Sequence, residues 1–163
     1  MRDIKTGDNL NQLMMHIEAP NRHWIRVKKS DISCRLLVDR HYSRQTVGAK
    51  LFTRPGKNIV LRTALGDAVW VTWQGIRDDG LQAWECTIFR NESEYLSSEL
   101  IREAIEITIE YWGKPPADGI ITTVDSNKVR SINPGCCFKK AGFSEIGKTK
   151  VNKLLILQYK PTI

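Results

Sequence analysis

The chain has 163 residues, of which 41% are hydrophobic and 26% charged, so it can bury a core and is too apolar for a disordered protein. Its formal net charge of +7 suggests a polyanionic partner such as nucleic acid. No apolar run approaches the length of a membrane span, and residues 1–20 lack the charged-then-apolar order of a signal peptide. These features predict a cytoplasmic protein with no membrane association. They fit a single domain over residues 1–163, in which 1–20 form an N-terminal extension of undecided structure.

Runs of β-branched and aromatic residues predict seven strands, and helical periodicity predicts three helices. The strands are expected at 23–27, 58–64, 68–74, 81–89, 119–124, 143–148 and 153–159. The helices are expected at about 31–41, 97–112 and 136–141. Ser30 or Asp31 can cap the first helix. The apolar residues that this helix is expected to turn inward are Ile32, Cys34, Leu36 and Leu37.

The stretch from Glu85 to Gly113 organises the chain, because a strand there feeds the longest helix. That helix has one apolar and one acidic face, Ser97 can cap its start, and Gly113 can end it. The connecting loop, 90–95, aims free backbone N–H groups and the positive end of the helix dipole at one spot. An anionic ligand could bind there. An ordinary strand–helix connection is the alternative.

The basic residues are unevenly distributed along the chain. No acid occurs from His41 to Gly66, and Glu145 is the only acid after Ser126, whereas acids gather on the 97–112 helix. This pattern predicts a polyanion-binding face opposite an acidic back. A generally basic surface is the alternative.

The order of elements predicts an α/β (α+β) fold with one central sheet and helices packed on its faces. This order, together with the sequence FKKAGF at 138–143, resembles the GNAT acyltransferase superfamily. The resemblance implies a mixed, mainly antiparallel sheet with helices on both faces and a splayed pair of strands that forms the cleft. In that superfamily the loop before the central helix carries the acyl-CoA pyrophosphate.

Within the superfamily the chain is most similar to the Mom DNA-modification proteins of Mu-like phages. The matching pieces, in order, are RHYS at 40–43, FRNE at 89–92 followed by LSSELI, TVDSNKVR at 123–130 and NPGCCFKKAGF at 133–143. Mom proteins convert adenines in DNA to a carbamoylmethyl-type N6-modified base, which protects the DNA from restriction. The resemblance therefore implies transfer of an acyl-derived group to adenine N6 in double-stranded DNA, in the host cytoplasm if the chain is phage-encoded.

The central loop departs from the GNAT pattern. Where that pattern has glycine or a small residue, this chain has Ser93 and Tyr95 after Arg90, so the backbone loses the close approach to phosphate that glycine allows. Glu92 and Glu94 would repel a pyrophosphate. The loop therefore disfavours acetyl-CoA and leaves the acyl donor unknown. An aminoacyl group carried on RNA is one candidate, because a basic face could hold the RNA.

Three residues are candidates for catalysis. His41 and Tyr42 lie at a predicted helix end, where histidine could act as a general base, position the adenine or bind a metal. Asp125 follows a buried strand at the end of the sheet where ligands bind, and it could orient His41, accept a proton or ligate a metal. His41 and Asp125 could together bind iron or another divalent ion. The alternatives are a helix-terminal histidine favoured by the dipole and an aspartate that serves the following turn.

Two further groups of residues are candidates for binding. Arg90 could hold a phosphate or carboxylate of the donor, unless it pairs with Glu92 or Glu94. The other candidates for donor binding are Asn91, Ser97 and Ser98. An enzyme that modifies N6 is expected to extrude the base from the duplex, so basic residues interleaved with an aromatic are candidates for DNA contact. These are Arg44, Lys50, Phe52, Arg54, Lys57, Lys128 and Arg130.

The sequence leaves two other functions open. One is a GNAT acetyltransferase that uses acetyl-CoA to modify a protein or a small amine, which the missing glycines disfavour. The other is a non-catalytic nucleic-acid-binding module with the same fold, which the RHYS and TVDSNKVR pieces disfavour. The oligomeric state cannot be read from the sequence.

Overall fold

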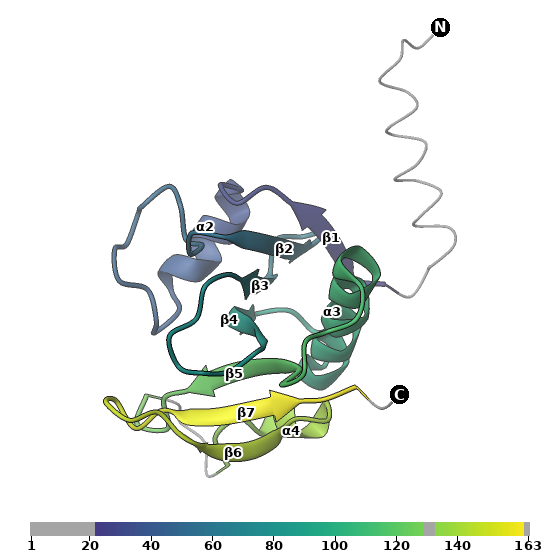
Figure 1. Ribbon diagram of the computed structural model, residues 1–163. Helices are drawn as coiled ribbons and strands as arrows, with labels where there is room; N and C mark the ends of the chain where they lie inside the picture. Colours follow the sequence, from purple (N-terminus) through teal and green to yellow (C-terminus); the bar gives the residue numbers. More distant parts are fainter. Residues whose placement is uncertain (1–21, 129–132, 162–163) are drawn as a thin grey trace, which may run out of the picture.

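The computed structural model describes residues 22–128 and 133–161, and these form an α+β fold around one open seven-stranded sheet (Figure 1). The sheet is mixed but mostly antiparallel, with strand order β1-β2-β3-β4-β5-β7-β6. The strands are β1 (Trp24–Val27), β2 (Lys57–Thr63), β3 (Ala68–Gln74), β4 (Trp84–Asn91), β5 (Ile120–Val124), β6 (Ser144–Lys148) and β7 (Leu155–Tyr159). The helices within the described ranges are α2 (Ile32–Asp39), α3 (Ser97–Trp112) and α4 (Cys136–Lys140). The predicted α+β class and mainly antiparallel sheet are confirmed, and no described helix has the length and apolarity that a bilayer span requires.

Helices cover both faces of the sheet. On one face, α2 packs Cys34, Leu37 and Val38 against side chains of β2, β3 and β4. On the other face, α3 and α4 pack against the opposite side chains of the same strands and of β5 and β7. Figure 1 shows α2 and α3 on opposite sides of the sheet.

The predicted inner face of α2 is partly wrong. Asp31 caps the helix, accepting a hydrogen bond from the Cys34 N–H at 3.0 Å, and Cys34 and Leu37 are buried as expected. Ile32 and Leu36, however, are 66% and 57% exposed. The buried stripe runs through Cys34, Leu37 and Val38, which share the i, i+3, i+4 spacing of one helix face.

The start of β4 lies three residues later than predicted. Gln82 does not pair with β3. Its N–H donates to the Asp118 carboxylate at 2.8 Å, and its carbonyl accepts from the Asp118 N–H at 2.9 Å. Residues 81–83 are therefore tied to the loop before β5, and the ladder begins at Trp84.

The parallel strands β4 and β5 separate along their length. They pair only at Trp84–Ile120, Glu85–Ile121 and Cys86–Thr122, although both strands continue beyond these pairs. A side chain from β4 after Cys86 therefore has no β5 neighbour in the ladder. This opening in the sheet positions the site described below.

Candidate functional site

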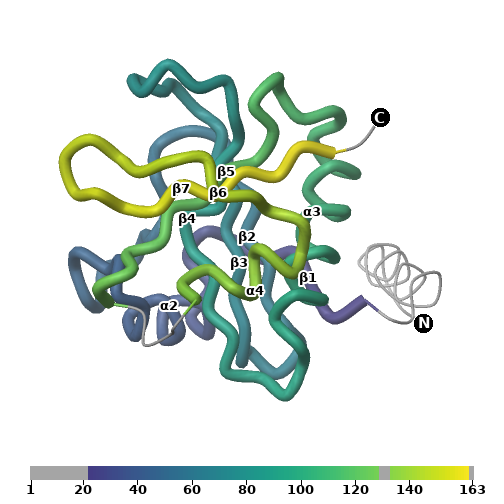
Figure 2. The backbone as a smooth tube through the Cα atoms, turned by 90° about the horizontal axis from the view of Figure 1, so that it is seen from below, coloured from purple at the N-terminus to yellow at the C-terminus, as the bar shows by residue number. Residues whose placement is uncertain are grey.

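A pocket of about 1220 Å³ lies where β4 and β5 separate, which is above the usual range of roughly 300–1,000 Å³ for ligand pockets. Its lining comes from the loop between α2 and β2 (residues 40–56), from β4 and β5, from the start of α3 and from the β6–β7 turn (residues 149–154). Figure 2 shows the α2–β2 loop and the β6–β7 turn on the same side of the molecule, as does Figure 1. The predicted site residues that line this pocket are His41, Tyr42, Arg44, Phe52, Arg54, Arg90, Asn91, Ser97, Asp125 and Lys128.

His41 is held in one tautomer by the residues that follow it. The Ser43 backbone N–H donates to His41 Nδ1 at 3.1 Å, and the Ser43 hydroxyl lies 2.7 Å from the same nitrogen. Because a backbone N–H can only donate, Nδ1 is unprotonated and Nε2 carries the proton of the neutral ring. Burial and the nearby Arg90 guanidinium lower the pKa of His41 to about 4, so the ring is neutral at pH 7. This geometry favours His41 as a hydrogen-bond donor that positions a ligand, rather than as a general base.

Tyr42 links His41 to Asp125. The Tyr42 ring stacks on the His41 ring with centroids 4.4 Å apart, and its hydroxyl oxygen lies 3.4 Å from the Asp125 N–H. Burial, with the Asp125 charge as a smaller cause, raises the pKa of Tyr42, so the phenol keeps its proton at pH 7.

Asp125 stabilises a turn and also lines the pocket. Its Oδ1 accepts a hydrogen bond from the Asn127 N–H at 3.0 Å, which is the turn role weighed above. Within the part of the chain that the structure describes, no hydrogen bond joins Asp125 to His41. Asp125 therefore does not orient the imidazole, and Ser43 does.

A metal centre built on His41 and Asp125 does not fit these contacts. Metal binding through Nε2 needs a lone pair on that nitrogen, whereas the Ser43 contacts place the proton there. Nowhere in residues 22–128 and 133–161 do three His, Cys, Asp or Glu side chains gather in a way that could hold a metal ion. The predicted iron or other divalent ion therefore has no ligand set among the described residues.

Arg90 is tied to Glu92 in its own loop and to Arg40 at the end of α2. Its Nε donates to Glu92 Oε2 at 2.6 Å and its guanidinium donates to the Arg40 carbonyl at 2.9 Å. Glu92 also accepts two bonds from Arg40, at 2.8 and 2.9 Å. Hydrogen bonds from Arg40 and Arg90 lower the pKa of Glu92 to about 2. The ion-pair alternative for Arg90 is therefore the arrangement present, although Arg90 also lines the pocket.

The loop before α3 is closed by its own side chains. Asn91 Nδ2 donates to the Tyr95 carbonyl and to Ser97 Oγ, while Asn91 Oδ1 accepts from Ser93. Leu96 rather than Ser97 is the N-cap of α3, and no side chain caps the helix, so the predicted Ser97 cap is wrong. Ser98, predicted to bind the donor, is 4% exposed and does not line the pocket, because its position on α3 faces the core.

Two predicted DNA contacts in the α2–β2 loop point inward. The Arg44 side chain is only 7% exposed, and it pairs with Asp39 at 2.9 Å. Its guanidinium also donates to the carbonyls of Ala49 and Leu51. Phe52 is buried in the cluster of apolar side chains that α2 packs against the sheet. Both residues fold the loop onto the protein, so the prediction that they contact DNA is not supported by their positions.

Arg54 belongs to a cluster around a buried carboxylate. Glu85 is 5% exposed and pairs with Arg54 at 3.0 Å and with Arg77 at 2.9 Å. Both guanidinium groups lie over the Trp73 ring, at 5.2 and 5.6 Å from its centroid. Arg54 therefore compensates a buried charge, which limits its use for a phosphate.

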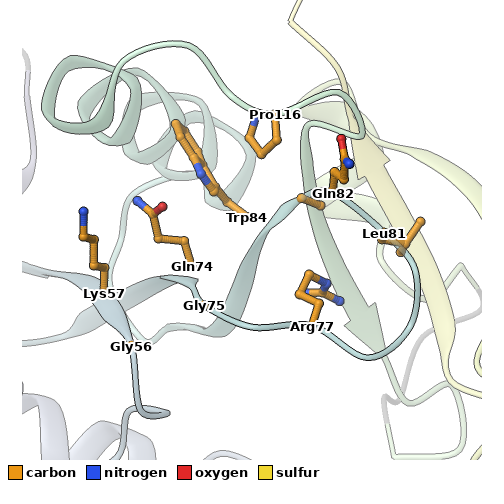
Figure 3. A pocket seen from close by; sticks show the side chains of 10 residues that line it. Gly56, Lys57, Gln74, Gly75, Arg77, Leu81, Gln82, Trp84 and Pro116 are labelled. Atoms are coloured by element: carbon orange, nitrogen blue, oxygen red, sulfur yellow. The ribbon is translucent and has the colours of Figure 1, made fainter.

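The predicted lysines are exposed, but they do not share one site. Lys50 lies between two pocket-lining residues, and Lys128 lines the pocket itself. Lys57 lines a separate pocket of about 540 Å³ near the start of β4, together with Arg77 and Trp84 (Figure 3). Arg130 lies outside the described residues.

Several pocket residues have no clear sequence signal. Thr87 Oγ1 is buried without a hydrogen-bond partner on the pocket wall. Asn152 and Leu154 reach the pocket from the β6–β7 turn. A polar position in a strand and a short hairpin turn look unremarkable in sequence, because their significance comes from the opening between β4 and β5. The lysines around that turn were the available signal.

Comparisons of the chain with known protein families, with curated proteins and with solved structures found no match.

Proposed function

We propose that this chain is a GNAT-like enzyme, most like the Mom proteins, which adds an acyl-derived, carbamoylmethyl-type group to adenine N6 in double-stranded DNA. The observation that carries the proposal is the convergence of His41, Tyr42 and Asp125 on one large pocket. These residues come from segments more than 80 positions apart, and the sequence predicts each of them to be catalytic. The separation of β4 and β5, the splayed pair expected of this fold, makes room for an extruded base.

The neutral His41 and Tyr42 side chains and the Asp125 carboxylate in the pocket suit transfer to an exocyclic amine. Attack by N6 forms a bond to the acyl carbon of the donor, breaks the bond from that carbon to the leaving group, which departs with a proton, and releases one proton from N6. The product of this step is an N6-acyl adenine. A carbamoylmethyl group is bonded to N6 through its methylene carbon, so it would form from this product by a later rearrangement. The Asp125 carboxylate is the proposed acceptor of that proton. The His41 Nε2–H and the Tyr42 hydroxyl are proposed to donate to the oxygen on which negative charge develops.

The donor in this proposal differs from the acetyl-CoA of a typical GNAT enzyme. The loop before α3 has no glycine and is closed by Asn91. These contacts support a donor other than acetyl-CoA, for which an aminoacyl group on RNA remains the candidate. Lys128, which is exposed, would hold the donor's negative charge at the pocket edge, and Arg90, which is paired with Glu92, would contribute less.

The test is nucleoside mass spectrometry of plasmid DNA from bacteria that express the chain. We expect a new modified adenosine with the wild-type protein, and a loss of roughly 100-fold or more with Asp125→Asn, because a general base contributes about that much. His41→Ala should have a similar effect through the loss of a charge-stabilising donor. Ile76→Ala, at a 98% exposed position outside the pocket, is the matched control and should retain full modification.

Two results would contradict the proposal. One is unmodified plasmid DNA together with acetylation of a protein or amine pool, which would favour the acetyltransferase alternative. The other is full modification by the Asp125→Asn protein. Circular dichroism of each variant checks that the fold is retained.

A further inference from the structure

The β6–β7 turn is a part of the pocket rim that carries none of the predicted site residues. The Thr149 N–H donates to the Leu154 carbonyl at 2.8 Å, and the Leu154 N–H donates to Thr149 Oγ1 at 2.9 Å. Lys153 has a left-handed backbone with φ of 54°, the only positive φ at a non-glycine residue among those described. The turn is therefore tied at both ends and presents its apex in a defined shape.

The turn has an inner and an outer side. Asn152 and Leu154 line the pocket, so the turn stands directly at its edge. Lys150, Val151 and Lys153 are exposed, and Val151 at the apex is 88% exposed. Single exposed aliphatic side chains are common on protein surfaces, so exposure alone does not mark Val151. Its position does, because it lies between Lys150 and the pocket-lining Asn152 at the rim of the pocket.

The lysines beside Val151 are not neutralised by the protein. Lys148, Lys150 and Lys153 are all exposed, and within the described part of the chain no hydrogen bond or ion pair engages their amino groups. The turn itself contains no acid, and Glu145 is the only acid after Ser126. The arginines of the α2–β2 loop, on the same side of the molecule (Figure 2), are instead paired with carboxylates. The amino groups of Lys148, Lys150 and Lys153 are therefore positive charges at this rim that remain available to a ligand.

We propose that the β6–β7 turn docks on duplex DNA beside the pocket, with its lysines on backbone phosphates and Val151 inserted into the base stack. This inference rests on the proposed function and names the element that would hold the duplex. Extrusion of an adenine breaks stacking on both of its sides, and apolar side chains inserted between base steps can stabilise such a gap. Valine suits the role because its branched side chain is stiff.

The lysine contacts are tested by fluorescence anisotropy of a labelled duplex at several salt concentrations. Lys148→Gln/Lys150→Gln/Lys153→Gln should reduce the log–log salt slope by about 3 and weaken binding at low salt by on the order of 100-fold. The control, Lys28→Gln/Lys114→Gln/Lys160→Gln, removes the same charge from exposed sites outside the pocket. Its slope should change by less than about 1.

Insertion of Val151 is tested with duplexes that each carry 2-aminopurine at one adenine position, at saturating protein. Wild-type protein should raise the fluorescence at the extruded position, and Val151→Ser should give less than about half of that rise. Ile76→Ser changes an aliphatic residue that is at least as exposed as Val151 and lies away from the pocket, and it should match the wild type.

The outcomes separate this inference from the proposed function. Wild-type protein that neither binds nor modifies DNA would overturn both. Wild-type protein that binds and modifies DNA, with an unchanged salt slope in the triple turn variant, would overturn the docking inference alone. The same holds if the triple variant loses affinity for a structured RNA but not for the duplex, or if Val151→Ser gives the full 2-aminopurine signal.

Discussion

Two walls of one pocket, the α2–β2 loop and the β6–β7 turn, are both rich in basic residues but use them differently. In the α2–β2 loop, Arg44 is tied to Asp39 and to two carbonyls, and Arg54 is tied to Glu85. In the β6–β7 turn, Lys150 and Lys153 are exposed, with no such partner among the described residues. A basic stretch in a sequence therefore does not say which of its cations are available to a ligand.

The physical reason for the difference lies in the side chains. The guanidinium group has five donors in a planar fork and is weakly hydrated, so it suits a buried carboxylate or a row of carbonyls. The lysine ammonium is compact and strongly hydrated, so it stays in water on a flexible stem. The arginines hold the loop in place, and the lysines keep their charge for a partner.

The largest effect that the comparison predicts is on stability. Arg44→Ala removes the ion-pair partner of Asp39, which keeps only its bond from the Gly48 N–H, and leaves the Ala49 and Leu51 carbonyls without this donor. We expect the melting temperature to fall by roughly 5–10 °C, as for the loss of a mostly buried charged residue in a chain of this size. Lys50→Ala, in the same loop but exposed, should shift it by less than about 2 °C. Equal melting temperatures for the two variants would remove the distinction between tied and free cations.

A smaller effect is expected on DNA binding. Here replacing a lysine should matter more than replacing an arginine. Lys50→Gln should lower the log–log salt slope by about 1, because this exposed lysine lies between two pocket-lining residues. Arg54→Gln should leave the slope closer to the wild-type value, since Arg54 already pairs with Glu85. Anisotropy titrations of both variants measure this difference, and a larger change for Arg54→Gln would contradict it.

Much of the fold could be predicted from the sequence because the local signals agree with the tertiary structure. The 97–112 helix has matching apolar periodicity, and its predicted bounds are those of α3. The strand at 68–74 was likewise placed correctly. The inner face of α2 was misjudged because an eight-residue helix carries apolar residues on both sides, and only packing against the sheet selects one.

The site was predictable in part for a similar reason. His41 and Asp125 follow elements whose ends meet at one edge of the sheet, so their convergence follows from topology. The state of His41 could not be predicted, because it depends on the Ser43 N–H and on the distance to Arg90 in space. Nor could the burial of Ser98, which depends on the rotation of α3 about its axis.

The smallest expected effect is on how stability depends on pH, and it comes from His41. This residue lies in the α2–β2 loop, close to Arg90. The folded protein lowers the pKa of His41 from 6.5 to about 4, so folding favours the neutral ring. The contribution to stability is therefore fully present above pH 6.5 and is lost as the pH falls towards 4, where the unfolded chain binds a proton that the folded chain does not.

Replacing His41 with Gln should remove that part of the acid sensitivity. Between pH 7 and pH 4.5, we expect the free energy of unfolding to fall less in His41→Gln than in wild type, by on the order of 1 kcal/mol after solvent screening in an open pocket. Urea titrations across this range measure the difference. Val47→Ala, an exposed and non-titrating change in the same loop, should give a curve parallel to wild type. A His41→Gln curve that is also parallel would mean that the ring is protonated as readily in the folded protein as in the unfolded chain, and the neutral donor role would fall with it.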